Sequence, residues 1–175
     1  PSAVLSEMSL VSAQAGTALL ELGTGETRSY EPATMVDLFQ AQAAQSPALT
    51  AVVDEVSSLT YAELDQASDA LAAELLAQGL QPEDFIAVML PRRKEFLVST
   101  LAVFKAGGAY IPFDDEYPTE RLQYMLDDSG AQVLITTHGL CEQKNSQGGF
   151  HTAHIIFLDE FDFTRAAAPV NRSRP

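Results

Sequence analysis

The sequence has little cysteine, no long apolar run and little positive charge. A single cysteine, Cys141, excludes an internal disulfide and is compatible with a reducing compartment. No apolar run approaches the roughly 18 residues of a membrane-spanning helix. No basic stretch precedes an apolar one at the start, as it would in a signal peptide. We therefore expect a soluble, cytoplasmic protein.

Positive charge is scarce and unevenly placed. Lys and Arg total 10 against 24 Asp and Glu, which gives a net charge of −14, and neither Lys nor Arg occurs between Arg28 and Arg92. Phosphate binding needs clustered cations, so nucleic acid is not expected as a partner. An anionic membrane surface is disfavoured for the same reason. Solubility is the simplest interpretation of the acidity.

The length of 175 residues and the hydrophobic content of 46% suit one globular domain with a sizeable core. The chain begins at Pro1 without Met and ends on "NRSRP", so we expect it to be a piece of a longer polypeptide. Residues 1–33 are weakly patterned, with a helix up to Gly23 and a linker "GTGETRSYEP". Residues 34–175 carry the periodic segments and form the predicted folded part.

The first helix of this part begins at Thr34, a candidate N-cap, and ends at Pro47, with apolar positions at Met35, Leu38 and Phe39. Extended segments over 49–55 and 57–60 follow. A second helix is the best specified, because "LTYAEL" (59–64) pairs Thr60 with Glu63 as a capping box and places Leu59 and Leu64 as a hydrophobic staple. Its inward face is predicted to be Leu64, Ala67, Leu71 and Leu75, with Gly79 as the stop.

The remaining segments alternate between the two periods. Strands are predicted over 85–90, 109–113, 132–137 and 154–160, and helices over 92–106 and 117–130, with a polar loop before the last strand. The 92–106 helix is expected to turn inward Phe96, Leu97, Thr100, Leu101 and Phe104. The order predicts an α/β fold, a mainly parallel sheet with helices on both faces.

The stretch "FKAGGAYIPFD" (104–114) combines a lysine with two glycines. In known phosphate loops the lysine follows the glycines or the glycines open a helix, whereas here Lys105 precedes them and they close one. Gly107 suits a left-handed helix stop, Gly108 a tight turn, and Lys105 the negative end of the helix dipole. The residues therefore favour an architectural role, and nothing beyond its identity supports Lys105 as a Schiff-base lysine.

Other polar groups invite chemical hypotheses. His138, Cys141, His151 and His154 form the pattern H-x2-C-x9-H-x2-H, which invites a zinc interpretation. The internal spacing is short for common zinc fingers and His154 opens a predicted strand, so a polar loop without metal is favoured. "RRK" at 92–94 is either an anion site at a helix start or a solvated first turn, and we favour the latter. The G-x-S-x-G motif of a catalytic serine is absent.

"LTYAEL" and "FKAGGAYIPFD" resemble the first two core motifs of the amino-acid adenylation domains of nonribosomal peptide synthetases, with Phe104 where Leu is usual. The following "YPTERLQYMLDDSGAQVLIT" (117–136) is similar to the same family, and the resemblance runs from about Thr34 to the end of the chain. Acyl-CoA synthetases and luciferases share the fold but usually lack the "KAGGAYIP" wording. The resemblance thus favours amino-acid activation, with residues 34–175 as the N-terminal part of the large subdomain.

The resemblance implies ATP, Mg²⁺ and an amino acid as reactants, and acyl transfer to the phosphopantetheine thiol of a carrier protein. It also implies the remainder of the adenylation domain and the peptidyl carrier and condensation domains as partners. The family's phosphate loop, pocket residues, ribose-binding aspartate and catalytic lysine have no counterpart here, and "APVNRSRP" resembles the stretch just before that loop. No catalytic, cofactor-binding or metal residue is therefore assigned. A non-catalytic docking or regulatory module and a standalone amino-acid or acyl ligase remain alternatives.

Overall fold

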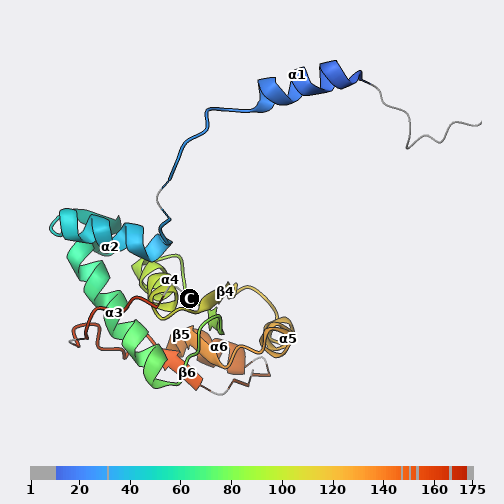
Figure 1. The fold of residues 1–175 in the computed structure, drawn as a ribbon. Coiled ribbons are helices and arrows are strands. Elements are labelled where there is room, and N and C mark those ends of the chain that lie inside the picture. Colours follow the sequence, from blue (N-terminus) through green and yellow to red (C-terminus); the bar gives the residue numbers. More distant parts are fainter. Residues whose placement is uncertain are drawn as a thin grey trace, which may run out of the picture. The chain divides into compact units, whose positions relative to one another are not determined.

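A computed structural model describes residues 11–30, 32–146, 148–149, 151–152, 154–165 and 167–172 (Figure 1). The chain divides into two units, Pro1–Pro32 and Ala33–Pro175. In the first unit, helix α1 spans Ala13–Gly23 and begins where the Ser12 hydroxyl accepts the N–H of Ala15 at 3.2 Å. None of the residues of α1 is buried, and the segment that follows it up to the unit boundary is irregular where it is described.

A parallel sheet of four strands organises the second unit. Its strands are β3 (Phe85–Val88), β4 (Ala109–Pro112), β5 (Val133–Thr136) and β6 (His154–Phe157), in the spatial order β4-β3-β5-β6. Every neighbouring pair is parallel, as crossover connections require. This arrangement confirms the predicted α/β fold class (Figure 1).

Helices cover both faces of this sheet. Alternate strand residues point to opposite faces, so Ile86, Val88 and Ile135 pack with helices α3 (Tyr61–Ala77) and α4 (Lys94–Lys105) in one apolar cluster. Ala87 and Leu134 pack with helices α5 (Thr119–Ser129) and α6 (His138–Asn145) in a second cluster. Helix α2 (Met35–Gln45) lies against α3 and α4.

The predicted cap of α3 is present. The Thr60 hydroxyl accepts the Glu63 N–H at 3.3 Å, and the Glu63 carboxylate accepts the Thr60 N–H at 2.8 Å. The backbone N–H and then the hydroxyl of Thr60 hold the pKa of Glu63 below its ordinary value. The predicted inward residues of α3 are buried, and Gly79 follows the helix with a φ of 90°.

Two helix faces differ from the sequence prediction. In α2, Met35 and Leu38 are 65% and 61% exposed, and Val36 and Ala43 are buried instead. In α4, Leu97 is 44% exposed, and the expected inward residues Phe96, Thr100, Leu101 and Phe104 are only partly buried. The buried residues of α4 are Val98, Ser99, Ala102, Val103 and Lys105. This face combines Val98, Ala102 and Val103 of the apolar cluster with the polar Ser99 and Lys105, so hydrophobicity alone does not decide which side of α4 is buried.

The first two extended segments form a separate antiparallel ribbon and do not join the parallel sheet. They are β1 (Thr50–Val53) and β2 (Ser58–Thr60). The short Asp54–Ser57 turn between them allows only antiparallel pairing, because a parallel pair needs a crossover connection. The predicted polar loop before the last strand is also wrong in part, because α6 begins there at His138 with Thr137 as its N-cap.

Within the described ranges, no helix is both long enough and apolar enough to span a membrane.

The cap of α3 should matter more for stability than the neighbouring surface cations. Thr60→Ala removes an N-cap acceptor and should lower the free energy of unfolding by about 1 kcal/mol. Arg93→Ala should cost under about 0.5 kcal/mol, because Arg93 occupies the N-cap position of α4 without a side-chain capping bond. Denaturant midpoints of the two variants measure the difference, and the reverse order would contradict the capping-box interpretation.

Candidate functional site

An unusual polar group among the described residues is the ammonium of Lys105, which is fully buried at the end of α4. Its Nζ lies 2.6 Å from Asp65 Oδ1 and 2.8 Å from Asp69 Oδ1, and donates to the Asp65 carbonyl at 2.9 Å. These three acceptors match the three protons of the ammonium. The ring of Phe39 lies 5.6 Å from the same nitrogen. We call Lys105, Asp65 and Asp69 the ion cluster.

The helices place these three residues together. Asp65 and Asp69 are one turn apart on α3 and therefore share a face. On α4, Lys105 follows Val98 and Ala102 along the stripe that packs on α3. The sequence prediction located Lys105 correctly in the last helical turn but did not foresee its two ion pairs. The two carboxylates, and not the helix dipole alone, balance the ammonium.

The C-terminal segment meets the ion cluster. Residues 167–172, which we call the exit segment, run along α3 toward α4 (Figure 1). The Val170 N–H donates to Asp69 Oδ1 at 3.1 Å, and the Arg172 N–H donates to the Lys105 carbonyl at 2.7 Å. Gln40 of α2 donates to the Val170 carbonyl at 3.3 Å. Three helices thus hold the backbone of the exit segment.

The two glycines after Lys105 sit against protein atoms. Gly107 has a φ of 84°, and a Cβ at this position would lie 2.8 Å from the Arg172 carbonyl oxygen. A Cβ on Gly108 would lie 2.7 Å from Ile86 Cδ1 and 3.0 Å from the Asp84 carbonyl oxygen. Both glycines are therefore needed for close packing and a left-handed turn.

This arrangement has little capacity for chemistry. Lys105 has no exposed surface, and its three donors are engaged, so it presents neither a lone pair to a carbonyl nor a free donor to a phosphate. The Cα hydrogens of both glycines point at protein atoms, since a Cβ on either residue would lie within 3.0 Å of a neighbouring atom. The described geometry agrees with an architectural role for "KAGG".

A cavity of about 640 Å³ lies at the carboxyl ends of β3 and β4. Helix α4 leaves β3 toward one face of the sheet and α5 leaves β4 toward the other, so the two loops diverge around the cavity. In α/β sheets, ligands bind in crevices of this kind. Arg92, Arg93, Lys94, Asp114 and Asp115 are among the residues that line it.

The cations of the "RRK" stretch at this cavity differ in their environment. Arg92 and Arg93 are exposed, whereas Lys94 lies 3.9 Å from Asp54 and also contacts the Ser57 hydroxyl. The N–H groups of Ser57, Val56 and Lys94 all donate to Asp54, which lowers the pKa of its carboxyl. Asp54 and Lys94 thus join the β1–β2 turn to α4, and the other two cations suit the predicted solvated turn.

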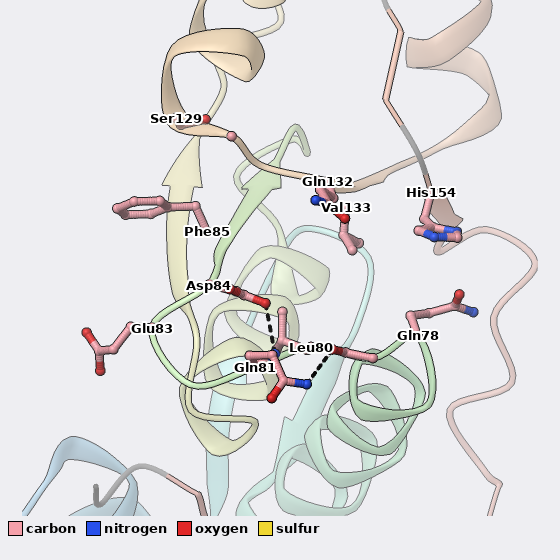
Figure 2. A pocket seen from close by; sticks show the side chains of 12 residues that line it. Gln78, Leu80, Gln81, Glu83, Asp84, Phe85, Ser129, Gln132, Val133 and His154 are labelled. Atoms are coloured by element: carbon pink, nitrogen blue, oxygen red, sulfur yellow. Dashed lines mark hydrogen bonds between the residues drawn. The ribbon is translucent and has the colours of Figure 1, made fainter.

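A second cavity, of about 420 Å³, lies at the opposite edge of the sheet, where β3, β5 and β6 begin (Figure 2). Figure 2 shows Gln81 bonded to its own loop, because its N–H donates to Asp84 at 2.8 Å and its amide donates to the Gly79 carbonyl at 2.9 Å. His154 and Gln132 line the same cavity. The amino ends of parallel strands are the edge where ligand sites are not expected.

The histidines and the cysteine of the zinc hypothesis have separate environments. His138 stacks on Phe157 with ring centroids 3.8 Å apart, and its Nδ1 lies 3.1 Å from Asp159. Burial opposes ionisation of Asp159, but the N–H and ring of His138 still hold its pKa below the ordinary value. Cys141 is buried in the α5–α6 cluster. The described residues contain no group of three or more His, Cys, Asp or Glu side chains suited to a metal.

Known proteins provide an independent comparison. The family model for AMP-binding enzymes matches residues 39–173. The match covers α3, the whole parallel sheet and the exit segment up to Arg172. The chain therefore belongs to the AMP-binding enzyme family.

Individual relatives are much longer than this chain. One of the plipastatin synthase proteins of Bacillus subtilis (strain 168) is 39% identical over 168 residues, which are 95% of this chain and 6% of that protein. Another plipastatin synthase protein of the same strain is 48% identical over 120 residues, or 69% of this chain and 5% of that protein. A linear gramicidin synthase protein of Brevibacillus parabrevis is 35% identical over 184 residues, and the match covers 99% of this chain and 4% of that protein. The chain thus spans a small fraction of each relative.

A solved structure has the same fold. The AMPPNP-bound form of a variant of the nonribosomal peptide synthetase FmoA3 aligns with a TM-score of 0.75 and 27% identity, covering 88% of this chain and 16% of that one.

The ion cluster should dominate the stability of the α3–α4 contact. Lys105→Met should lower the free energy of unfolding by about 3–5 kcal/mol, because two carboxylates lose their cation in a mostly buried place. Arg165→Ala is the control, since Arg165 pairs with Glu74 at 3.3 Å with its side chain 67% exposed. That change should cost about 1 kcal/mol or less. Equal shifts in urea midpoint would show that the cluster is not stabilising.

The histidines and Cys141 are predicted to bind no structural zinc, because their sequence spacing is poor and Asp159 already engages His138. Metal analysis of the purified chain, prepared without chelator, should find far less than one zinc per molecule. One zinc per chain with spectroscopic signs of His and Cys ligation would contradict this prediction.

Proposed function

We propose that residues 34–175 form the N-terminal part of the large subdomain of an amino-acid adenylation domain in a nonribosomal peptide synthetase. The complete domain would convert an amino acid and ATP into an aminoacyl adenylate and pyrophosphate. It would then transfer the aminoacyl group to the phosphopantetheine thiol of a carrier protein. Within that enzyme, this part would build the sheet and support the catalytic loops.

The match of residues 39–173 to the AMP-binding family carries the proposal. Its narrowing to peptide synthesis is supported by similarity to plipastatin and linear gramicidin synthases, and by the fold of FmoA3. ATP is supported as a reactant because the FmoA3 structure holds AMPPNP. Mg²⁺ and the peptidyl carrier and condensation domains complete the proposed reactants and partners. A cytoplasmic location is part of the proposal, because one cysteine suits a reducing compartment.

The ion cluster and the two glycines after it do not have the properties of an ATP site. The buried lysine has its donors engaged, the glycines face protein atoms, and no metal-suited carboxylate group lies within the described ranges. Displacing pyrophosphate needs cations, backbone donors and Mg²⁺ around the α-phosphate. We therefore propose that positions 1–175 contribute no catalytic, cofactor-binding or metal residue, and that other parts of the enzyme contact the nucleotide.

Two alternatives remain beside this proposal. A non-catalytic docking or regulatory module would share the fold without the reaction, and a standalone amino-acid or acyl ligase would share the reaction without the assembly line. The coding sequence downstream of Pro175 distinguishes the docking module, since a phosphate loop there supports the enzyme and a stop codon supports the module.

The 175-residue chain alone should not catalyse amino-acid-dependent exchange of pyrophosphate into ATP. A polypeptide extended through the phosphate loop and C-terminal domain should catalyse the exchange with one or a few amino acids, and should load a carrier thiol. Radiolabelled pyrophosphate and mass spectrometry of the carrier measure the two steps. Exchange by the short chain, abolished by Lys105→Ala, would overturn the architectural assignment. Activity of the extended protein with fatty acids only would indicate an acyl-CoA synthetase.

A further inference from the structure

The exit segment is bonded to α2 through Gln40 and Asp37, and it meets α3 and α4 at one corner, which consists of Asp65, Asp69, Lys105 and Gly107. We call it the lysine corner. Lys105 acts there through two groups, since its ammonium fixes Asp69 and its carbonyl accepts the Arg172 N–H at 2.7 Å. The Asp69 oxygen that binds the ammonium also accepts the Val170 N–H at 3.1 Å. The same residues therefore join α3 to α4 and hold the exit segment.

The charges of the lysine corner explain why the Val170 N–H donates to Asp69. One ammonium faces two carboxylates, at 2.6 and 2.8 Å, so the ion cluster keeps an excess negative charge. The Asp69 side chain is only 8% exposed, so water reaches it poorly. A backbone N–H is a good donor to a carboxylate in such surroundings. The ion cluster thus offers the exit segment a fixed, charged acceptor.

The shape of the corner adds a steric requirement. The Arg172 carbonyl oxygen comes so close to Gly107 that a Cβ would lie 2.8 Å from it. The N–H of the same residue, Arg172, bonds to the Lys105 carbonyl, so a larger side chain at position 107 must displace the residue that makes this bond. Only glycine leaves the exit segment in its observed path.

We propose that the lysine corner is a positioning device that fixes the exit segment, and through it the start of the polypeptide that follows. Stability alone does not account for the corner, because an apolar replacement of a buried ion pair often stabilises a protein equally well. A defined path for residues 170–172 needs the charged acceptor and the glycine together. If the proposed function holds, the following polypeptide carries the phosphate loop, and Lys105 is a positioning residue for it.

Two glycine variants separate positioning from strain. Gly107→Ala and Gly79→Ala both force a side chain into a left-handed backbone, with φ of 84° and 90°. A Cβ on Gly79 meets nothing within 4 Å, whereas a Cβ on Gly107 meets the exit segment. Amide hydrogen exchange of the 175-residue chain, resolved by residue, reports the result. The buried Met89 amide, bonded to the Ile135 carbonyl at 2.9 Å, serves as the core reference.

We expect the Arg172 amide to exchange about tenfold faster or more in Gly107→Ala than in Gly79→Ala, as loss of one hydrogen bond implies. Exchange at Met89 should be the same in both variants. Equal exchange at Arg172 in the two variants would overturn the proposal. Lack of protection at Val170 and Arg172 in the unaltered chain would overturn it as well.

Rapid exchange of the Met89 amide would reveal that Gly107→Ala fails to fold. In that case, two aspartate variants test whether the lysine corner positions the exit segment. Asp69→Ala removes an oxygen that serves both Lys105 and Val170, whereas Asp65→Ala removes one that serves Lys105 alone. The Val170 amide should lose about tenfold or more of its protection only in Asp69→Ala. Equal loss of Val170 protection in both variants would mean that the lysine corner only joins α3 to α4 and does not position the exit segment.

Kinetics of the extended protein test the consequence for function separately. Exchange activity of the unaltered extended protein tests the proposed function. Given that activity, Gly107→Ala should raise KM for ATP relative to Gly79→Ala while leaving KM for the amino acid unchanged. An inactive extended protein with the amide result intact would refute the adenylation role and keep the positioning role.

Discussion

The structure depends on one ammonium group placed where water does not reach it. Burial of Lys105 is unfavourable by itself, and two aspartates one helical turn apart on α3 compensate it. This requirement sets the rotation of α4, because the helix must turn its last lysine toward α3. Ser99 and Ala102 are then buried, and the larger Phe96 and Phe104 are only partly buried and pack edge-on against Tyr110.

The layers follow from this contact. With α3 and α4 fixed together on one face, β3 and β4 flank α4 in sequence, and α5 and α6 cover the other face with their own apolar cluster. The β1–β2 ribbon is joined to the start of α4 through Asp54, and the exit segment to its end through Lys105. Helix α4 therefore receives a distant segment at each of its ends, which suits a scaffold better than a catalytic element.

Local signals predicted the elements well, and long-range contacts decided what the sequence did not reveal. The Thr60–Glu63 cap and the left-handed turns at Gly79 and Gly107 are local features, so the sequence predicted them. The inward face of α4 was not predicted correctly, because Lys105 breaks the apolar pattern and its partners lie about forty positions earlier. The acids at 65 and 69 could have been noticed as a pair on an otherwise apolar helix face, but nothing local links them to Lys105. Helix α6 was missed because Gly139 and a short polar run hide the cap at Thr137.

The absence of Lys and Arg between Arg28 and Arg92 has a consequence for folding. Helix α3 carries acids but no cation within its own segment, so its ion pairs to Lys105 and Arg165 join residues 36 to 91 positions apart. Most surface helices recruit part of their electrostatic stabilisation from neighbours one turn away, early in folding. In α3, no ion pair can form until the distant segments that carry Lys105 and Arg165 have docked. The attractive charge pairs of this helix therefore have a high contact order. Ion pairs with cations therefore act in α3 as a late check on tertiary assembly, and the Glu63 cap is the charged contact that is already available when the helix begins to form.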